Sequence, residues 1–251
     1  MPESQRLSGF LLINKPAGIT SHDVVDQLRR ITCEKRIGHS GTLDPFATGL
    51  LIVGVGRVAT KRLGELQKLP KTYRATLMLG AISDTGDRTG TIVVRHPELA
   101  SGSLSSPTGI GDPKNDRGFR VKPGMTTVLN TLNKFTGQTQ QIPPMYSAKK
   151  IAGKKLYELA RAGIIVERTP ITITITRLDL LGYQWPILEI EVDCSSGTYI
   201  RTLAEDIGQA LGCGAYAQEL ERLTIGSYHL NNAAKLDTIT PENFQDHLFQ
   251  I

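Results

Sequence analysis

The alternation of apolar and polar positions divides the chain into short strands. Period-2 alternation, typical of half-buried strands, occurs in Lys71–Leu79, 171–176 and 188–194. Uninterrupted apolar runs at 9–14 and 50–53 predict strands buried on both faces. The turn-forming stretch 84–90 is followed by 91–95, which predicts the returning strand of a hairpin. A second antiparallel hairpin is expected where 171–176 and 188–194 face each other across a turn at Gly182.

Helical spacing of apolar residues predicts the remaining elements. Thr20 or Ser21 can cap a helix that places Val24, Leu28 and Ile31 on one face. Further helices are predicted at 59–66, 126–135, 200–211 and 241–248, the third of which ends at Gly212. Helices interspersed with short-turn hairpins predict an α+β fold class, in which a mixed, largely antiparallel sheet is flanked by helices around a central cleft.

The stretch 38–49 reads as a shaped loop rather than a helix or strand. Glycines permit positive φ and Pro45 fixes φ, so the backbone path there is specified residue by residue. The loop carries His39 and Asp44 between rigid elements, where chemistry tends to be placed. By spacing alone, Asp44 is most simply a turn former. No further His, Cys or acid stands at metal-ligand spacing, which argues against a metal site.

A second pattern in this region allows a different function. The residues from Gly54 to Ala59 fit G-x-G-x-x-A, the dinucleotide-binding pattern, between a strand and a helix. Arg74 stands where a ribose-binding acid is expected, and the strands that follow look antiparallel. A nicotinamide enzyme therefore stays an alternative, weakened but open.

The composition further predicts a polyanionic partner and a location in a reducing compartment. The 251 residues suffice for one large domain or one and a half. There are 29 basic and 24 acidic residues, with a pI near 9.1. The three cysteines are few and widely spaced, which argues against disulfides, and no signal or membrane-spanning stretch is present, so we expect a cytoplasmic protein.

Two segments after the first hairpin have unusual composition. Residues 96–123 are rich in Ser, Gly and Pro without apolar periodicity, which predicts a mobile surface loop. The family resemblance described below implies that 101–120 in this loop is an insertion. Farther on, a Pro-Pro step and Tyr146 precede Lys149, Lys150, Lys154 and Lys155. Such lysines often lie on a solvated face, but beside an aromatic ring they suit a phosphate backbone with a stacked base.

Several motifs together resemble one enzyme family. The loop GHSGTLDPFATGL at 38–50 is similar to the signature loop of the TruB-type tRNA pseudouridine synthases. Further motifs agree at 12–18, 71–90, 141–163 and 194–228. The resemblance implies a pseudouridine synthase fold, with a catalytic domain at 1–228, an RNA-gripping thumb at 136–163 and a short segment at 229–251 that has no room for a complete PUA domain.

The same resemblance assigns roles to individual residues. Asp44 would be the catalytic carboxylate, Arg201 its partner and Tyr73 the active-site tyrosine. Leu223 would line the base pocket, and His39 would hold the remodelled T-loop of tRNA. Substrate binding would further use Tyr146, Lys149, Lys150, Lys154 and Lys155.

The implied activity is isomerisation of the T-loop uridine at position 55, without metal or cofactor, by a monomer that needs no obligate protein partner. Independently of the resemblance, Arg201 lies in the first turn of a predicted helix, where a cation is unfavourable unless an anion faces it. A non-catalytic RNA-binding module is a second alternative, because it would use the same lysines.

Overall fold

The computed structural model describes residues 8–95, 122–147, 149–151, 153–164 and 166–251. The predicted loop and insertion at 101–120 therefore lie outside the described residues.

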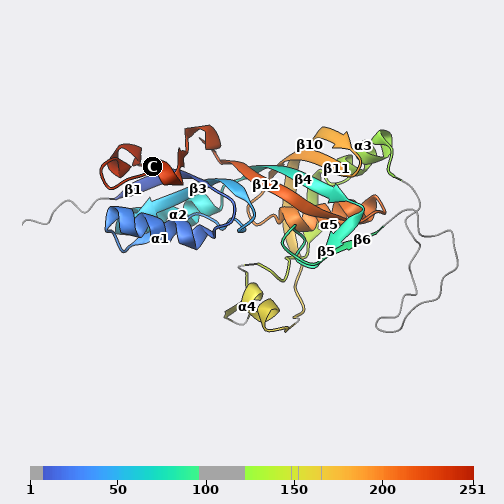
Figure 1. Ribbon diagram of the computed structural model, residues 1–251, viewed down its shortest axis with the longest axis horizontal. Coiled ribbons are helices and arrows are strands. Elements are labelled where there is room, and N and C mark those ends of the chain that lie inside the picture. The colour runs from blue at the N-terminus through green and yellow to red at the C-terminus, as the bar shows by residue number, and fades with distance from the viewer. Residues whose placement is uncertain (1–7, 96–121, 148, 152, 165) are drawn as a thin grey trace, which may run out of the picture.

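One ten-stranded sheet runs along the long axis of the molecule (Figure 1). Its main path is β14-β1-β3-β12-β4-β11-β10-β7, with β2 paired to β3 and β13 to β12. The strand bounds are β1 Gly9–Lys15, β2 Ile37–His39, β3 Thr48–Val55, β4 Lys71–Leu79, β7 Gly137–Gln141, β10 Ile171–Gln184, β11 Ile187–Cys194, β12 Ala215–Ile225, β13 Tyr228–His229 and β14 Ala234–Lys235. In this sheet only β1–β14 and β3–β12 pair in parallel, so the predicted mixed, largely antiparallel sheet is confirmed for the described chain.

Two small hairpins and several helices surround the sheet. The hairpins are β5 (Ala81–Ser83) with β6 (Ile92–Val94) and β8 (Lys150–Ile151) with β9 (Lys154–Lys155). The helices are α1 Ser21–Thr32, α2 Gly56–Gln67, α3 Met125–Asn133, α4 Leu156–Arg161 and α5 Ile200–Ala210, with short 3-10 turns at Leu230–Asn232, Leu236–Thr238 and Phe244–His247. Thr20 caps α1 in a capping box with Asp23, as its position before the apolar face predicted.

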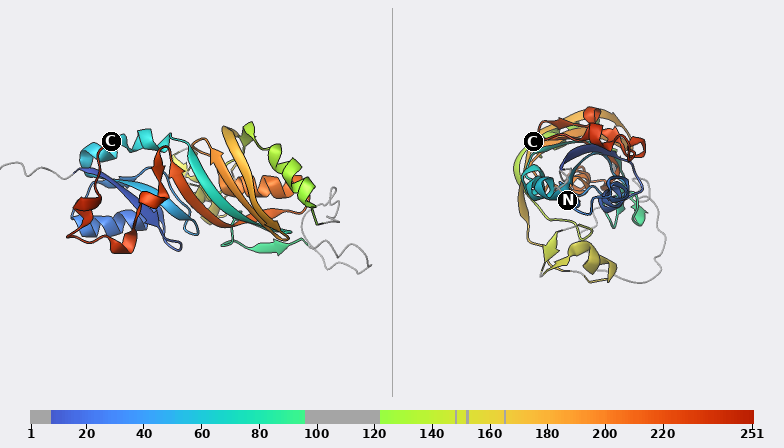
Figure 2. Two further views of the ribbon diagram at one scale, coloured as in Figure 1. Left: turned by 90° about the horizontal axis from the view of Figure 1, so that it is seen from above. Right: turned by 90° about the vertical axis from the view of Figure 1, so that its left-hand side faces the viewer.

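Helices α1 and α2 cover opposite faces of β1 and β3 (Figure 2). In β3, Leu51 and Val53 join the α1 core, whereas Leu50 and Ile52 join the α2 core. This arrangement explains the uninterrupted apolar run, because both faces of the strand are buried. At the other end of the sheet, α3 and α5 cover only the face that carries the alternating apolar residues of β4, and the opposite face is polar, as the alternation predicted.

The structure corrects three predictions about element boundaries. Strand β10 continues through Gly182 to Gln184, and the chain turns only at Trp185–Pro186, because a bulge between Leu180 and Gly182 absorbs the irregularity within the strand. Residues 137–141 form an edge strand, so only later residues of 136–163 leave the sheet as a thumb. Within 241–248 the helical residues are a 3-10 turn, Phe244–His247.

The C-terminal segment, 229–251, pairs with the sheet and packs against α1. Strand β14 pairs with β1, and Phe249 exchanges backbone hydrogen bonds with Phe10 at 2.9 and 3.0 Å. Leu236, Ile239 and Phe244 are buried against α1. The expected division between 1–228 and 229–251 therefore does not separate two packing units.

The G-x-G-x-x-A pattern has a packing role. A Cβ at Gly54 would lie 3.2 Å from both the carbonyl carbon of Ala59 and a methyl group of Leu63, so the glycine lets α2 pack close to β3. At this end β3 pairs antiparallel with β1 and β2, not in a parallel βαβ unit. The nicotinamide alternative thus loses its structural basis.

None of the helices in the described part of the chain has the length and apolar character that crossing a membrane requires.

Candidate active site

The Asp44 loop joins β2 to β3 and is anchored by the segment that precedes it. The Ser21 hydroxyl accepts from Leu43 N at 2.9 Å and donates to Leu43 O at 3.2 Å. The buried Lys15 ammonium and Gly18 N donate to Pro45 O at 3.4 and 2.8 Å. Burial lowers the pKa of Lys15 to about 8. These contacts on both sides of Asp44 fix its backbone.

Arg201, in the first turn of α5, holds the Asp44 carboxylate from two sides. Its Nε lies 2.9 Å from Asp44 Oδ2, and its Nη2 donates to Asp44 Oδ1 at 3.2 Å. Its Nη1 lies 3.4 Å from Asp87 Oδ2 and donates to Thr85 O at 2.7 Å, and Nη2 also donates to Tyr146 O at 2.6 Å. Asp44 and Asp87 therefore both supply the anionic partner that the position of Arg201 predicted.

Asp87 is a component that the sequence patterns did not identify. It lies in the predicted turn 84–90 and is buried. Its Oδ1 accepts from the Thr85 hydroxyl at 3.0 Å, from Thr89 N at 2.9 Å and from the Thr89 hydroxyl at 2.5 Å. The two hydroxyls beside an acid in DTGDRTG were the available signal, but such residues are common in ordinary turns.

The electrostatics of Asp44 reflect opposing effects. Burial raises the pKa of its carboxyl, Arg201 counters that rise, and the Asp87 charge adds to it. The Asp44 side chain keeps 32% of its surface exposed, whereas Arg201 keeps 4%. The carboxylate is thus the accessible member of the pair, and the guanidinium is its buried support.

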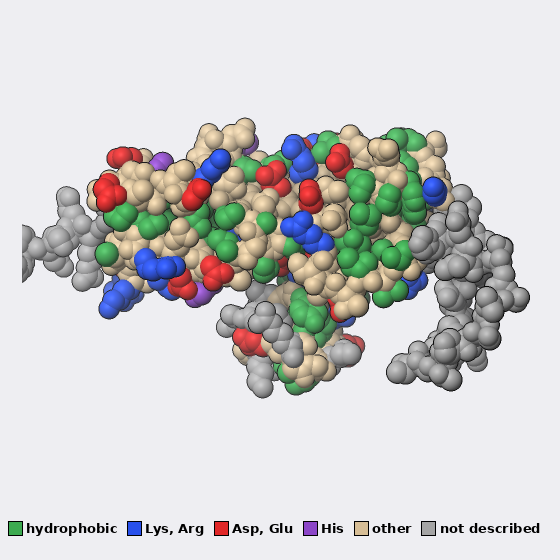
Figure 3. Space-filling model, viewed as in Figure 1, with side chains coloured by type: hydrophobic (Ala, Val, Ile, Leu, Met, Phe, Trp, Pro, Cys, Tyr) green, Lys and Arg blue, Asp and Glu red, His purple; other side chains and the backbone are tan. Residues whose placement is uncertain are grey.

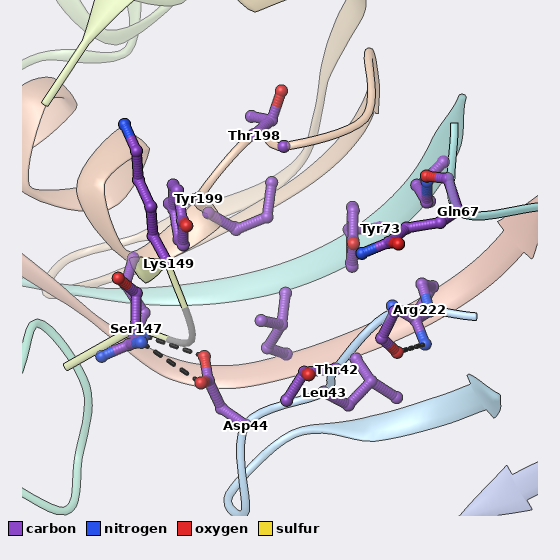
Figure 4. A pocket seen from close by; sticks show the side chains of 16 residues that line it. Thr42, Leu43, Asp44, Gln67, Tyr73, Ser147, Lys149, Thr198, Tyr199 and Arg222 are labelled. Carbon is purple, nitrogen blue, oxygen red and sulfur yellow. Dashed lines mark hydrogen bonds and ion pairs between the residues drawn. The ribbon is translucent and has the colours of Figure 1, made fainter. Parts of the chain in front are cut away.

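A cavity of about 360 Å³ opens above this pair (Figure 4). Leu43, Tyr73, Tyr199, Ile200 and Leu220 supply aromatic and apolar surface. The polar and small residues that line it are Gly41, Thr42, Asp44, Gln67, Lys71, Ser147, Lys149, Gly197, Thr198, Arg201 and Arg222. The combination suits a flat, polar-edged ring carried on a sugar.

Tyr73 lines the cavity from β4 and is buried. Burial raises the pKa of its phenol, and the Arg222 charge counters part of that rise. Tyr73 is therefore a neutral phenol at neutral pH. Its ring is positioned by the pairing of its backbone with Val192 on one side and with Arg222 on the other.

Leu223 is not among the residues that line the cavity; Leu220 is. Leu220 and Arg222 stand two residues apart on the side of β12 that faces the cavity, whereas Leu223 directly follows Arg222, at the bulge between Arg222 and Thr224 in the pairing with β4. Leu223 lies inside β12, two residues before the end of the strand. A short motif does not specify the register of a bulged strand, so the resemblance pointed to Leu223 instead of Leu220.

His39 lies in β2 and is also absent from the cavity wall. It is half-buried, and its Nδ1 has no hydrogen-bond partner among the described residues. Burial and, to a smaller extent, the Arg222 charge lower the pKa of its imidazole. His39 therefore carries a neutral imidazole next to the Asp44 loop.

The predicted thumb leaves the body directly beside the site. Lys149 lines the cavity, Tyr146 is exposed and its carbonyl accepts from Arg201. Lys150 pairs with Lys155 in the β8–β9 hairpin, which also contains Lys154 and leads into α4. Figure 3 shows this part projecting from the body on the side where basic side chains gather over α1. The phosphate contacts of these lysines stay a prediction.

No cluster of three or more His, Cys, Asp or Glu in the described residues could hold a metal ion.

Solved structures define the class. The chain is similar to one in the crystal structure of a Cbf5-Nop10-Gar1 complex, with a TM-score of 0.65 and 23% identity, covering 94% of this chain and 54% of that one. A structure of an H/ACA RNP bound to a substrate RNA containing 2'-deoxyuridine gives a TM-score of 0.62 and 22% identity, covering 94% and 53%. This chain spans about half of each. This chain shares its fold with both, and the family model described next identifies that fold as the pseudouridine synthase fold that the resemblance predicted.

Sequence comparison then gives the family. The model of the TruB family pseudouridylate synthase N-terminal domain matches residues 29–106 and 118–200, and that of the tRNA pseudouridylate synthase B C-terminal domain matches 201–249. The tRNA pseudouridine synthase B of Bordetella avium is 45% identical over 235 residues, covering 94% of this chain and 88% of the relative. That of Protochlamydia amoebophila is 39% identical over 247 residues, covering 97% and 84%. The chain belongs to the TruB family.

Proposed function

We propose that this chain is a tRNA pseudouridine synthase, as the names of its relatives indicate, and that it isomerises the T-loop uridine at position 55. The observation that carries the proposal is the Asp44–Arg201 pair at the wall of a base-sized cavity. Uridine and pseudouridine are isomers: the C1′–N1 bond breaks, a C1′–C5 bond forms, C5 loses a proton and N1 gains one. The exchange is redox-neutral and consumes no co-reactant.

Asp44 starts the exchange, either as a nucleophile toward the sugar or the base or as the base that removes a sugar proton. Arg201 keeps the carboxylate ionised and oriented, since without a cation burial would favour the protonated acid. Tyr73 stacks on the uracil and moves a proton, and Leu220, rather than Leu223, closes the pocket beside it. The target base must first leave its stack, at a cost of roughly a few kcal/mol.

The RNA contacts that offset this cost come from the thumb. Tyr146, Lys149, Lys150, Lys154 and Lys155 hold the backbone of the T-arm, and His39 contacts the remodelled T-loop. Action as a monomer is part of this proposal. A tRNA substrate also supports a cytoplasmic location.

The test uses an unmodified T-arm stem-loop in EDTA without added cofactor. The wild-type protein should form pseudouridine at the target position. Asp44→Asn should bind the RNA with unchanged affinity but show no turnover, because an amide keeps the shape of the side chain and cannot act as a carboxylate. Asp237→Asn, which changes an exposed acid outside the cavity, is the matched control and should retain full activity.

Appreciable turnover by Asp44→Asn would remove the basis for its assignment. RNA binding by the wild type without any pseudouridine would instead favour the non-catalytic RNA-binding alternative.

A further inference from the structure

Arg222 is a buried cation that the proposed chemistry has not used. It is the largest fully buried side chain among the described residues, with 1% of its surface exposed. Its Nε donates to Leu50 O at 2.7 Å and its Nη2 to Gly41 O at 3.2 Å. Its neighbours across the strands are Gly49 and Tyr73. Arg222 thus ties together the two ends of the Asp44 loop while lining the cavity.

The charge of Arg222 lacks an acidic partner in the described part of the chain. Its hydrogen-bond partners are the carbonyls of Leu50 and Gly41 and the Tyr73 phenol, and it forms no ion pair with a carboxylate of the described residues. The pKa values of Lys15, Lys71 and His39 are lowered chiefly by burial, and the Arg222 charge lowers each of them further. Buried charges are ordinarily paired, so an unpaired one at a cavity wall points to an anionic ligand or intermediate.

The Asp44 carboxylate and the Arg222 guanidinium lie on different sides of the cavity. On one side two acids, Asp44 and Asp87, share one guanidinium, that of Arg201. On the other side stand Arg222 and Lys71, whose ammonium donates to Gln67 O and Leu69 O, each at 2.5 Å. Figure 4 shows Asp44 and Arg222 at opposite sides of the cavity. A substrate between them has one part facing the nucleophile and another facing the cations.

We propose that Arg222, with Lys71 beside it, stabilises the negative charge that uracil acquires when it detaches from the sugar. The inference rests on the proposed function. When the C1′–N1 bond breaks, its electron pair stays on N1 and spreads to the carbonyl oxygens of the base. The charge disappears when C5 bonds to C1′, C5 loses its proton and N1 takes one up. Preorganised donors aimed at such a charge act strongly where water is excluded.

A role limited to anchoring the loop gives a different result, and the substrate can separate the two. Fluorine at C5 withdraws electrons, so 5-fluorouracil carries negative charge more readily than uracil and needs less help from a cation. Loss of a charge-stabilising residue should therefore matter less for a 5-fluorouridine substrate. Loss of a loop anchor should matter equally for both.

The experiment measures single-turnover detachment and rejoining of the base in two T-arm RNAs, one with uridine and one with 5-fluorouridine at the target position. C5 of the 5-fluoro substrate carries fluorine instead of hydrogen, so its C-glycoside keeps the fluorine and does not undergo the final proton loss from C5. Product is therefore followed as the C-glycoside, with or without fluorine, in nuclease digests, and RNA affinity is measured in parallel. Arg222→Gln removes the charge but keeps an amide donor, whereas Arg222→Lys keeps the charge. Ser21→Ala is the matched loop control, since it removes the hydrogen bonds to Leu43 without changing any charge.

Arg222→Gln should slow the uridine substrate by about 10²-fold and the 5-fluorouridine substrate by about tenfold or less, with unchanged RNA affinity. Arg222→Lys should recover most of the loss, and Ser21→Ala should slow both substrates equally. If Arg222→Gln does not fold, Lys71→Gln should show the same substrate-dependent difference to a smaller extent.

Equal slowing of both substrates by Arg222→Gln, or by Lys71→Gln in its place, would overturn the inference and leave the proposed function intact. A loss confined to RNA affinity would also overturn it, because that result assigns the charge to a phosphate. Failure of the wild type to convert uridine would overturn the proposed function itself.

Discussion

Replacing Arg201 with Met removes the charge at the centre of the site while keeping a side chain of similar reach. Asp44 loses two contacts, at 2.9 and 3.2 Å, and Asp87 loses one at 3.4 Å. Two carboxylates then face each other across an apolar side chain. We expect the variant to lose both stability and turnover, for different reasons.

Breaking a buried ion pair from one side costs about 3–5 kcal/mol. The lower end applies to Asp44, because 32% of its side chain is exposed and water can hydrate the carboxylate. Only 6% of the Asp87 side chain is exposed. A loss of about 3 kcal/mol leaves a typical domain folded. Turnover should fall by about 10²–10³-fold, since an oriented electrostatic contact at the reacting group is lost.

The pH dependence provides a further check. The pKa of the Asp44 carboxyl is already raised by burial, and without Arg201 it rises further above its unfolded value of about 3.9. The folded variant then binds a proton more tightly than the unfolded chain, so its stability deficit shrinks as pH falls from 7 toward 5. Turnover needs the ionised carboxylate, so it falls as the pH is lowered. In the variant this fall should begin at a higher pH than in the wild type.

The assay combines urea unfolding with single-turnover rates on T-arm RNA between pH 5 and 8. Arg177→Met is a matched control, because Arg177 contacts Asp179, Glu191 and Asp193 on the polar face of the sheet with 40% of its side chain exposed. Exposed pairs contribute about 0–1 kcal/mol each, so this variant should be nearly as stable as the wild type and fully active. Turnover by Arg201→Met within about threefold of the wild type, or a stability loss no larger than that of Arg177→Met, would refute the reasoning.

Two further predictions follow from the thumb and the loop. Changing Lys149, Lys150, Lys154 and Lys155 to Ala should weaken tRNA binding and reduce the slope of log affinity against log salt by about 3, measured by a salt titration; an unchanged slope would place these lysines on a solvated face. Gly49→Ala should prevent stable folding in thermal melts, since its φ is +104° and a Cβ would lie 2.4 Å from Arg222 O. Gly18→Ala, at φ +90° with no atom within 4 Å of a Cβ, should cost only about 1–2 kcal/mol, and equal losses would refute the clash.

The sequence by itself determined the local elements and the identity of the loop. Apolar periodicity located both faces of β3 and the buried side of β4, because side-chain direction alternates along any regular strand. The capping box at Thr20 and the glycines that flank Asp44 are likewise local, since they depend on a few neighbouring dihedral angles. The motif around Asp44 was specific enough to indicate the family.

Only the tertiary structure decided which distant residues complete the site. Asp87 reaches Arg201 because the 84–90 turn folds against α5, and no spacing of 114 residues predicts such a contact. Leu220 and Arg222, instead of Leu223, line the cavity because they stand two residues apart on one side of β12, and the pairing of β12 with β3 and β4 turns that side toward the Asp44 loop. The C-terminal segment joins the sheet beside β1 through long-range pairing. These outcomes depend on strand register and on packing between elements, which a local sequence pattern does not specify.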